Sequence, residues 1–286
     1  MKSSSGAHFV ALDHVRAIAA FMVFAWHFSH YSNGYPVPFE YVPNFFPLAL
    51  LDEGHTGVAL FMTLSGYLFA KLLDGKFINY PAFFWNRALR LLPLLFLVIF
   101  LVGIQKYVNS ENIKVYVYEI IKGAVLPTLP NGGWSITVEF QYYLTLPVLF
   151  WMFRHSKFLP IMIVILAILT RYGVYSVRGE VQTFAYWTIL GRIDQFALGM
   201  LFFSFRNIFF QRHGLILAIA LIFSLFYWTF DLFGGFYQYQ TYPSPSLTWV
   251  IMPTIEGLAY SAIIAWYEIS FKHSTTGFSW FLGKIG

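Results

Sequence analysis

The residues with the clearest chemical potential lie in the first apolar stretch of the chain, FVALDHVRAIAAFMVFAWHFSH, which runs from Phe9 to His30. A stretch of this length is sufficient to cross a bilayer as a helix. It nevertheless carries five ionisable side chains, those of Asp13, His14, Arg16, His27 and His30. Because ionisable groups at bilayer depth are costly and usually face the protein interior or a wet cavity, this stretch is predicted to contribute to a functional site.

The spacing of these residues predicts that they share one face of a helix. Arg16 and His27 are 11 residues apart, and in an α-helix that separation returns to within about 20° of the same face, roughly 16 Å further along the axis. Asp13 lies one turn before Arg16, and His30 lies one turn after His27. We therefore expect one polar stripe that faces a cavity and an opposite face that is apolar.

His27 is the candidate general base, because a neutral imidazole can remove a proton from an attacking hydroxyl group. The alternative is a hydrogen-bonded histidine between helices. His30 is nearer the water, where it would replace His27 as base or line the mouth of the cavity. Arg16 is a candidate for orienting a substrate carbonyl, held by Asp13; the alternative for this pair is a buried salt bridge that satisfies both charges.

The composition indicates an integral membrane protein. Hydrophobic residues make up 58% of the chain and charged residues 11%, with a mean hydropathy of +0.62, whereas soluble domains carry about 25% charged residues. The net charge of +5 is therefore attributed to basic cytoplasmic loops, and nucleic-acid binding is not expected. The chain has no cysteine, which excludes disulfides and a cysteine nucleophile.

The elements that must position these residues are predicted from the apolar runs. Eight runs are candidate spans, at approximately 9–29, 48–70, 88–106, 134–153, 158–175, 183–205, 214–233 and 247–269. Residues 107–133 are expected to form a surface helix or a partial re-entry, not a full crossing. The predicted fold is an all-α polytopic membrane bundle, forming a single domain over 1–286 with no attached soluble domain.

The basic residues predict the orientation of the bundle. The alternation of spans assigns ten to the inner side, Lys2, Lys71, Lys76, Arg87, Arg90, Arg154, Lys157, Arg206, Arg212 and Lys272. It assigns five to the outer side, Lys106, Lys114, Lys122, Arg171 and Arg178. Because cytoplasmic loops carry an excess of Lys and Arg, we expect a cytoplasmic N-terminus, with the loop around 31–47 outside.

Four motifs in the first half of the chain resemble those of the acyltransferase 3 family, bacterial membrane O-acyltransferases of cell-envelope sugars. They are Arg16 followed by His27, the segment GVALFMTLSGY from Gly57 to Tyr67, the pair Arg87 and Arg90 followed by Pro93, and WSITVEFQYY from Trp134 to Tyr143. Two departures are noted. Ala59 replaces an acidic residue of the family, and the chain ends at GKIG, where the family usually continues through two more spans, so we expect a C-terminally truncated member.

The resemblance implies acyl-CoA as a cytoplasmic donor, and acetyl-CoA is the form expected. The acceptor implied is a hydroxyl of an envelope glycan such as lipopolysaccharide O-antigen, exopolysaccharide or peptidoglycan, and the location implied is the bacterial inner membrane. CoA phosphates require cationic groups, for which Arg16, Arg87 and Arg90 are the candidates. The alternative for Arg87 and Arg90 is simple anchoring of a span at the inner surface.

Glu139 is expected either to orient His27 or to pair with an arginine such as Arg192. Trp134 and Ser135 lead the same segment and are expected to support the site, although no nucleophile elbow surrounds the serine. No metal site is expected, because His27 with His30 lacks an obvious third ligand. A proton-coupled secondary transporter of a small polar solute, using the intramembrane His, Asp and Glu residues, is the alternative function.

Overall fold

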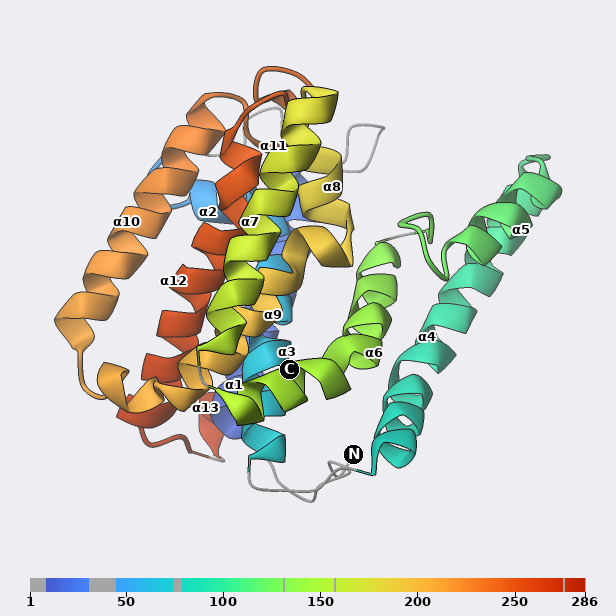
Figure 1. Ribbon diagram of the computed structural model, residues 1–286. Coiled ribbons are helices and arrows are strands. Elements are labelled where there is room, and N and C mark those ends of the chain that lie inside the picture. The colour runs from blue at the N-terminus through green and yellow to red at the C-terminus, as the bar shows by residue number, and fades with distance from the viewer. Residues whose placement is uncertain are drawn as a thin grey trace.

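The structure is a computed structural model that describes residues 9–30, 45–74, 79–130, 132–156, 158–274 and 276–285, and every regular element in these ranges is a helix (Figure 1). All eight predicted spans are helical. They correspond to α1 (Val10–Ser29), α3 (Gly57–Leu73), α4 (Tyr80–Val108), α6 (Trp134–His155), α7 (Leu159–Arg178), α9 (Ile189–Ser204), α10 (His213–Leu232) and α12 (Thr248–Ser270).

Five of these helices, α1, α4, α7, α10 and α12, are long and apolar enough to cross a membrane. The helices α3 and α9 are shorter, with 17 and 16 residues. The 22-residue α6 carries Glu139 and Arg154 and is less apolar. The all-α membrane fold is therefore confirmed, whereas eight complete crossings remain a prediction.

Short helices gather at the two ends of the bundle (Figure 1). The helices α2 (Ala49–Asp52), α8 (Gln182–Trp187) and α11 (Gly235–Gln238) lie at the end where α1 finishes, together with the 3₁₀ turn η1 (Gly54–Thr56). The 3₁₀ turn η2 (Arg206–Phe209) and α13 (Gly277–Ile285) lie at the opposite end. Most of the loop expected outside, residues 31–44, falls outside the described residues.

The centre of the bundle is α9, which packs against α3, α7 and α12. Glycines permit the closest of these contacts. A Cβ added at Gly199 would collide with the backbone carbonyl of Thr63 on α3, and one added at Gly66 would collide with the carbonyl of Phe196 on α9. Small residues let helix backbones approach in this way when the surrounding solvent is lipid.

A hairpin formed by α4 and α5 (Ile113–Lys122) stands to one side of the bundle (Figure 1). The Tyr116 hydroxyl donates to the Ile99 carbonyl at 2.7 Å and fastens the two helices together. With 10 residues, α5 is too short to cross a bilayer. This agrees with the expectation that residues 107–133 do not form a full crossing.

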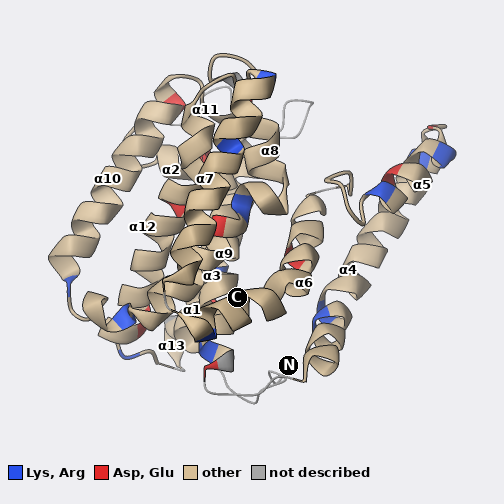
Figure 2. Cartoon of the chain, in the orientation of Figure 1, with Lys and Arg blue, Asp and Glu red and all other residues tan. Residues whose placement is uncertain are grey.

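One residue counted among the outer basic positions is buried inside the bundle. Arg171 in α7 is completely inaccessible and donates to the carbonyls of Val250 and Gly191 and to the side chains of Asp194 and Thr254, at 2.6 to 2.7 Å. Figure 2 shows such charges within the otherwise uncharged middle of the bundle. The assignment of Arg171 to an outer loop was wrong, because a fully hydrogen-bonded arginine is tolerated at depth.

Candidate active site

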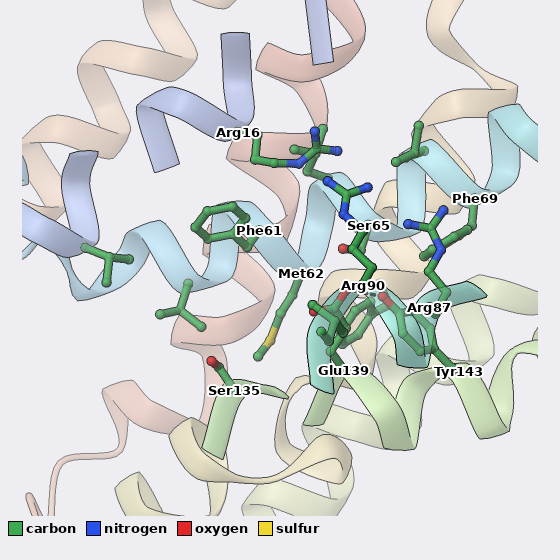
Figure 3. Close-up of a pocket in the computed structure, with 16 residues that line it drawn as sticks. Arg16, Phe61, Met62, Ser65, Phe69, Arg87, Arg90, Ser135, Glu139 and Tyr143 are labelled. Carbon is green, nitrogen blue, oxygen red and sulfur yellow. Dashed lines mark hydrogen bonds between the residues drawn. The ribbon is translucent and has the colours of Figure 1, made fainter. Parts of the chain in front are cut away.

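Five helices, α1, α3, α4, α6 and α9, line a cavity of about 300 Å³ that we call the arginine cavity (Figure 3). Its polar walls are Arg16 of α1, Ser65 of α3, Arg87 and Arg90 of α4, and Ser135, Glu139 and Tyr143 of α6. The structure thus brings together the three arginines predicted from separate motifs. Figure 3 shows their guanidinium groups gathered on one side of the cavity, with Glu139 and Tyr143 on the other.

Neighbouring side chains position two of these arginines. Arg16 donates to the Asp13 carboxylate at 2.6 Å, as the spacing predicted. The guanidinium carbon of Arg87 lies 4.7 Å from the centre of the Phe69 ring and 5.5 Å from that of Phe83. Aromatic faces attract a cation and hold its plane in one orientation. Arg90, which follows Arg87 by almost one turn of α4, is more exposed.

Glu139 is the acidic group of the arginine cavity. Its carboxylate accepts a hydrogen bond from the Tyr143 hydroxyl one turn later, and it interacts electrostatically with the three arginines of the cavity. In the described part of the chain it has no hydrogen bond to His27. Arg192 donates instead to the Tyr186 carbonyl at 2.6 Å and to Gln195 at 3.1 Å. Glu139 therefore interacts with arginines, as the second alternative expected, but with Arg87, Arg90 and Arg16 and not with Arg192. A catalytic role for this carboxylate remains a prediction.

A second cavity, of about 590 Å³, contains His27, and we call it the histidine cavity. Aromatic side chains dominate its walls, and part of α4 closes one side through Leu94, Leu95 and Val98. The ring-bearing residues that line it are Trp26, His27, His55, Trp134, Tyr186, Trp187 and Tyr237. A cavity lined by flat apolar rings with a few polar groups suits an organic substrate.

His27 presents its imidazole to this cavity. The side chain is exposed, and its ring centre lies 4.8 Å from that of Trp26 at an angle of 70°. No hydrogen bond joins the ring to another described residue. Within the described ranges, the alternative of a structural histidine fixed between helices therefore gains no support from a hydrogen bond, and the role of His27 as base stays a prediction.

The two cavities adjoin. Val23 of α1, Val58 of α3 and Ser135 of α6 line both of them. The Ser135 hydroxyl donates its proton to the Gly132 carbonyl at 2.9 Å, so this proton is already engaged in a hydrogen bond. Arg16 and His27 thus face adjoining spaces, with Val23 between them on the same helix. The expectation that one polar stripe faces a single cavity was wrong, because Arg16 and His27 line different cavities and neither Asp13 nor His30 is among the lining residues of either.

The remaining predicted residues lie around the histidine cavity. Trp134 is buried, with its ring centre 4.7 Å from that of Trp187. The guanidinium carbon of Arg192 lies 5.8 Å from the Trp134 ring and 4.2 Å from that of Tyr186, so Arg192 supports the wall from behind. His30 is not among the lining residues; its Nδ1 donates to the Trp26 carbonyl at 3.1 Å.

Two site residues were missed by sequence reasoning. Tyr143 was quoted in a motif but given no role, although it binds Glu139. His55 was not singled out at all, yet it is completely buried and lines the histidine cavity. The sequence feature that could have identified His55 is its position at the start of an otherwise apolar run, in DEGHTGVALF. Such a histidine is a functional-site candidate for the same reason as His27.

Comparison with known proteins agrees with this geometry. A family model described as an acyltransferase domain, that of acyltransferase 3, matches residues 9–271. The match includes every residue that lines the two cavities. Neither the curated proteins nor the solved structures that were compared gave a match.

Proposed function

The chain belongs to the acyltransferase 3 family and is a membrane acyltransferase, and on that premise we propose a reaction across the two cavities. An acetyl or other short acyl group moves from acyl-CoA, which is held at the arginine cavity, to a hydroxyl group of a glycan in the histidine cavity. The observation that carries the proposal is the common wall formed by Val23, Val58 and Ser135.

The arginine cavity is the proposed donor site. Acyl-CoA is strongly anionic, and guanidinium groups bind phosphates through paired, permanently charged donors. Arg87 and Arg90 lie in the first half of α4, and Arg16 lies in the first half of α1. These helix starts share one end of the bundle (Figure 1). That end carries most of the predicted inner basic residues, which supports a cytoplasmic N-terminus and a cytoplasmic donor in the bacterial inner membrane.

The proposed chemistry uses His27 as the general base. The neutral imidazole takes the proton of the acceptor hydroxyl while the hydroxyl oxygen attacks the thioester carbonyl carbon. The carbon–sulfur bond then breaks, CoA leaves as the thiolate, and the imidazolium returns its proton to that sulfur. Arg16 lies where it can face the carbonyl oxygen as negative charge develops there. Glu139 and Tyr143 line the same cavity, and the Glu139 carboxylate interacts electrostatically with its three arginines.

The histidine cavity is the proposed acceptor site. Its rings, among them Trp26, Trp134 and Tyr237, offer flat apolar faces that suit the faces of sugar rings. The acceptor class proposed is an extracytoplasmic glycan, for example lipopolysaccharide O-antigen, exopolysaccharide or peptidoglycan. The family assignment favours this enzyme over a proton-coupled transporter of a small polar solute.

The test is transfer of labelled acetyl from acetyl-CoA to extracted envelope glycan by the purified protein. Replacing His27 with Ala is expected to lower the turnover rate by about 10²- to 10⁴-fold, the usual contribution of a general base. Binding of acetyl-CoA should remain, because His27 does not line the arginine cavity. His155→Ala, at an exposed position at the end of α6, is the matched control. Full transfer activity in His27→Ala would rule out this assignment.

A further inference from the structure

A cluster of ionisable residues outside both cavities is not used by the proposed reaction. His30 follows α1, Asp52 and Glu53 end α2, and Asp231 lies in the last turn of α10. One ligand atom from each of His30, Asp52 and Glu53 lies within 4.8 Å of the other two. Asp231 interacts with both Asp52 and His30. The ends of α1 and α2 thus bring three potential metal ligands together, and Asp231 at the end of α10 is close enough to interact with two of them.

The hydrogen bonding of His30 leaves one of its nitrogens available. His30 Nδ1 lies 3.1 Å from the Trp26 carbonyl, which can only accept, and 3.2 Å from the Ser29 hydroxyl, which itself donates to the Ala25 carbonyl at 2.8 Å. A proton on Nδ1 satisfies both contacts. In the neutral ring the Nε2 atom then carries a lone pair. Metal-ligating histidines typically have this arrangement, with one nitrogen fixed by a carbonyl and the other directed at the ion.

One oxygen of the carboxylate that faces His30 has no hydrogen-bond partner in the described structure, while the Asp52 side chain interacts with Asp231. Asp52 is 7% exposed, and its Oδ1 atom accepts no hydrogen bond in the described structure; the same is true of Asp231 Oδ2. Asp52 Oδ1 lies 3.5 Å from His30 Nε2, beyond the 2.7 to 2.9 Å of a charge-assisted hydrogen bond. Two ligands that are each about 2.1 Å from a tetrahedral ion lie about 3.4 Å apart. The observed distance therefore fits two ligands of a common ion better than a direct ion pair.

The charges of the cluster also suit a bound metal ion. Glu53 is 1% exposed and accepts from the Phe236 amide through both oxygens, at 3.2 Å. In the described ranges, the ion pairs of Asp52 and Glu53 are with histidines, and none is with Lys or Arg. Buried carboxylates are stable when they are paired or when they coordinate a metal. Two carboxylates and a neutral imidazole match the charge and the donor atoms of a divalent transition-metal ion.

We propose that His30, Asp52 and Glu53, completed by Asp231, bind a divalent transition-metal cation such as Zn²⁺ beside the histidine cavity. The ion ties the ends of α1, α2 and α10 together. The His30 ring centre lies 5.6 Å from that of Trp26 and 6.1 Å from that of Tyr237, two residues of the cavity wall. The ion thereby sets the shape of the proposed acceptor site. It replaces the expectation of no metal site, which considered only His27 as a partner for His30.

Zinc content and thermal stability test this proposal without an activity assay. The full chain is purified in detergent through a tag that lacks histidine, stripped with a chelator and dialysed against ZnCl₂. Wild type is expected to retain about one Zn²⁺ per chain, as a four-ligand site would, and to show a higher Tm with zinc. Asp52→Asn and His30→Gln are expected to bind at least about tenfold more weakly, since even indirect partners of a metal ligand contribute that much.

Asp74→Asn and His155→Gln are the matched controls, because both residues are exposed and lie at the opposite end of the bundle. Both control variants should bind zinc, and zinc should raise their Tm as it does that of the wild type. Zinc binding in Asp52→Asn equal to that in wild type, or no zinc-dependent rise of Tm in wild type, overturns the proposal. If both site variants fail to fold, the wild-type protein alone tests the proposal. Saturation of its zinc binding at one Zn²⁺ per chain supports the site, and the absence of zinc binding refutes it.

Discussion

At the scale of single residues, the proposed reaction assigns binding of the charged donor to one cavity and proton transfer to the other. The arginine cavity gathers Arg16, Arg87 and Arg90 with one acidic partner, Glu139. The histidine cavity has aromatic walls and presents His27 without a competing hydrogen bond from the described residues. In the proposed reaction this separation keeps the base away from the guanidinium groups of Arg87 and Arg90, whose positive charge would oppose the protonated imidazole, while Arg16 faces the thioester carbonyl.

Arg87 allows the donor site to be tested by a conservative change. Arg87→Lys keeps the charge but loses the planar fork and its stacking on Phe69 and Phe83. We expect acetyl-CoA binding to weaken by roughly 10- to 100-fold, which corresponds to the loss of a charged hydrogen bond. Isothermal titration of the purified protein with acetyl-CoA measures this change. Arg212→Lys, at an exposed position before α10, is the control, and unchanged binding in Arg87→Lys would contradict the donor site.

At the scale of elements, the glycine contacts between α3 and α9 hold the scaffold of both cavities. Met62, Ser65 and Phe69 of α3 line the arginine cavity on one side of this contact. A shift of α3 would therefore move the walls of the donor site. Close packing of this kind is sensitive to a single added methyl group, because the opposing atom is backbone and not a flexible side chain.

Gly199→Ala tests this contact. The new methyl group would meet the Thr63 carbonyl, so we expect a loss of about 1 to 3 kcal/mol of stability, typical of overpacking. Thermal unfolding in detergent should show a lower Tm. Gly173→Ala in α7 is the matched control, since nothing lies within 4 Å of the added Cβ. A Tm in Gly199→Ala as high as that of the control would show that α3 and α9 are not in such close contact.

The positions of the long helices, and contacts between residues at a fixed spacing within one helix, could be predicted from the sequence. Apolar runs predicted all eight long helices, because length and composition govern burial in lipid. The Asp13–Arg16 pair followed from helix geometry alone. Contacts between distant helices could not be predicted in this way. The partner of Glu139, the burial of Arg171 and the cluster around His30 each depend on how separate helices pack, which no local pattern encodes.

At the scale of the whole molecule, the donor must reach the arginines from one side of the membrane and the acceptor must reach His27 from the other, if the proposed reaction takes place. The Arg16 and Arg87 ends of their helices lie at one end of the bundle, and the short helices α2, α8 and α11 cap the other (Figure 1). The basic residues predict that the arginine end is cytoplasmic. That prediction holds after the removal of Arg171 from the outer residues, since the inner excess becomes larger.

Single-cysteine labelling tests this orientation. Because the chain has no native cysteine, only the introduced cysteine can react with the label. Thr183→Cys lies in α8 at the capped end, and Ser274→Cys lies between α12 and α13 at the other; both positions are exposed. In intact cells or spheroplasts, a membrane-impermeant maleimide should label Thr183→Cys at once and Ser274→Cys only after permeabilisation. The reverse pattern would place the arginine cavity outside and remove its access to a cytoplasmic donor.

The most direct measurement of the central claim is an experimental structure of the protein with a non-hydrolysable acetyl-CoA analogue. We predict density for the CoA phosphates against Arg87 and Arg90, with the acyl end at the wall shared by the two cavities, next to Val23 and Ser135. The acyl carbonyl would then point from the arginine cavity towards His27. Phosphates bound elsewhere, or an acyl end that never reaches the shared wall, would contradict the proposal that transfer takes place between these two cavities.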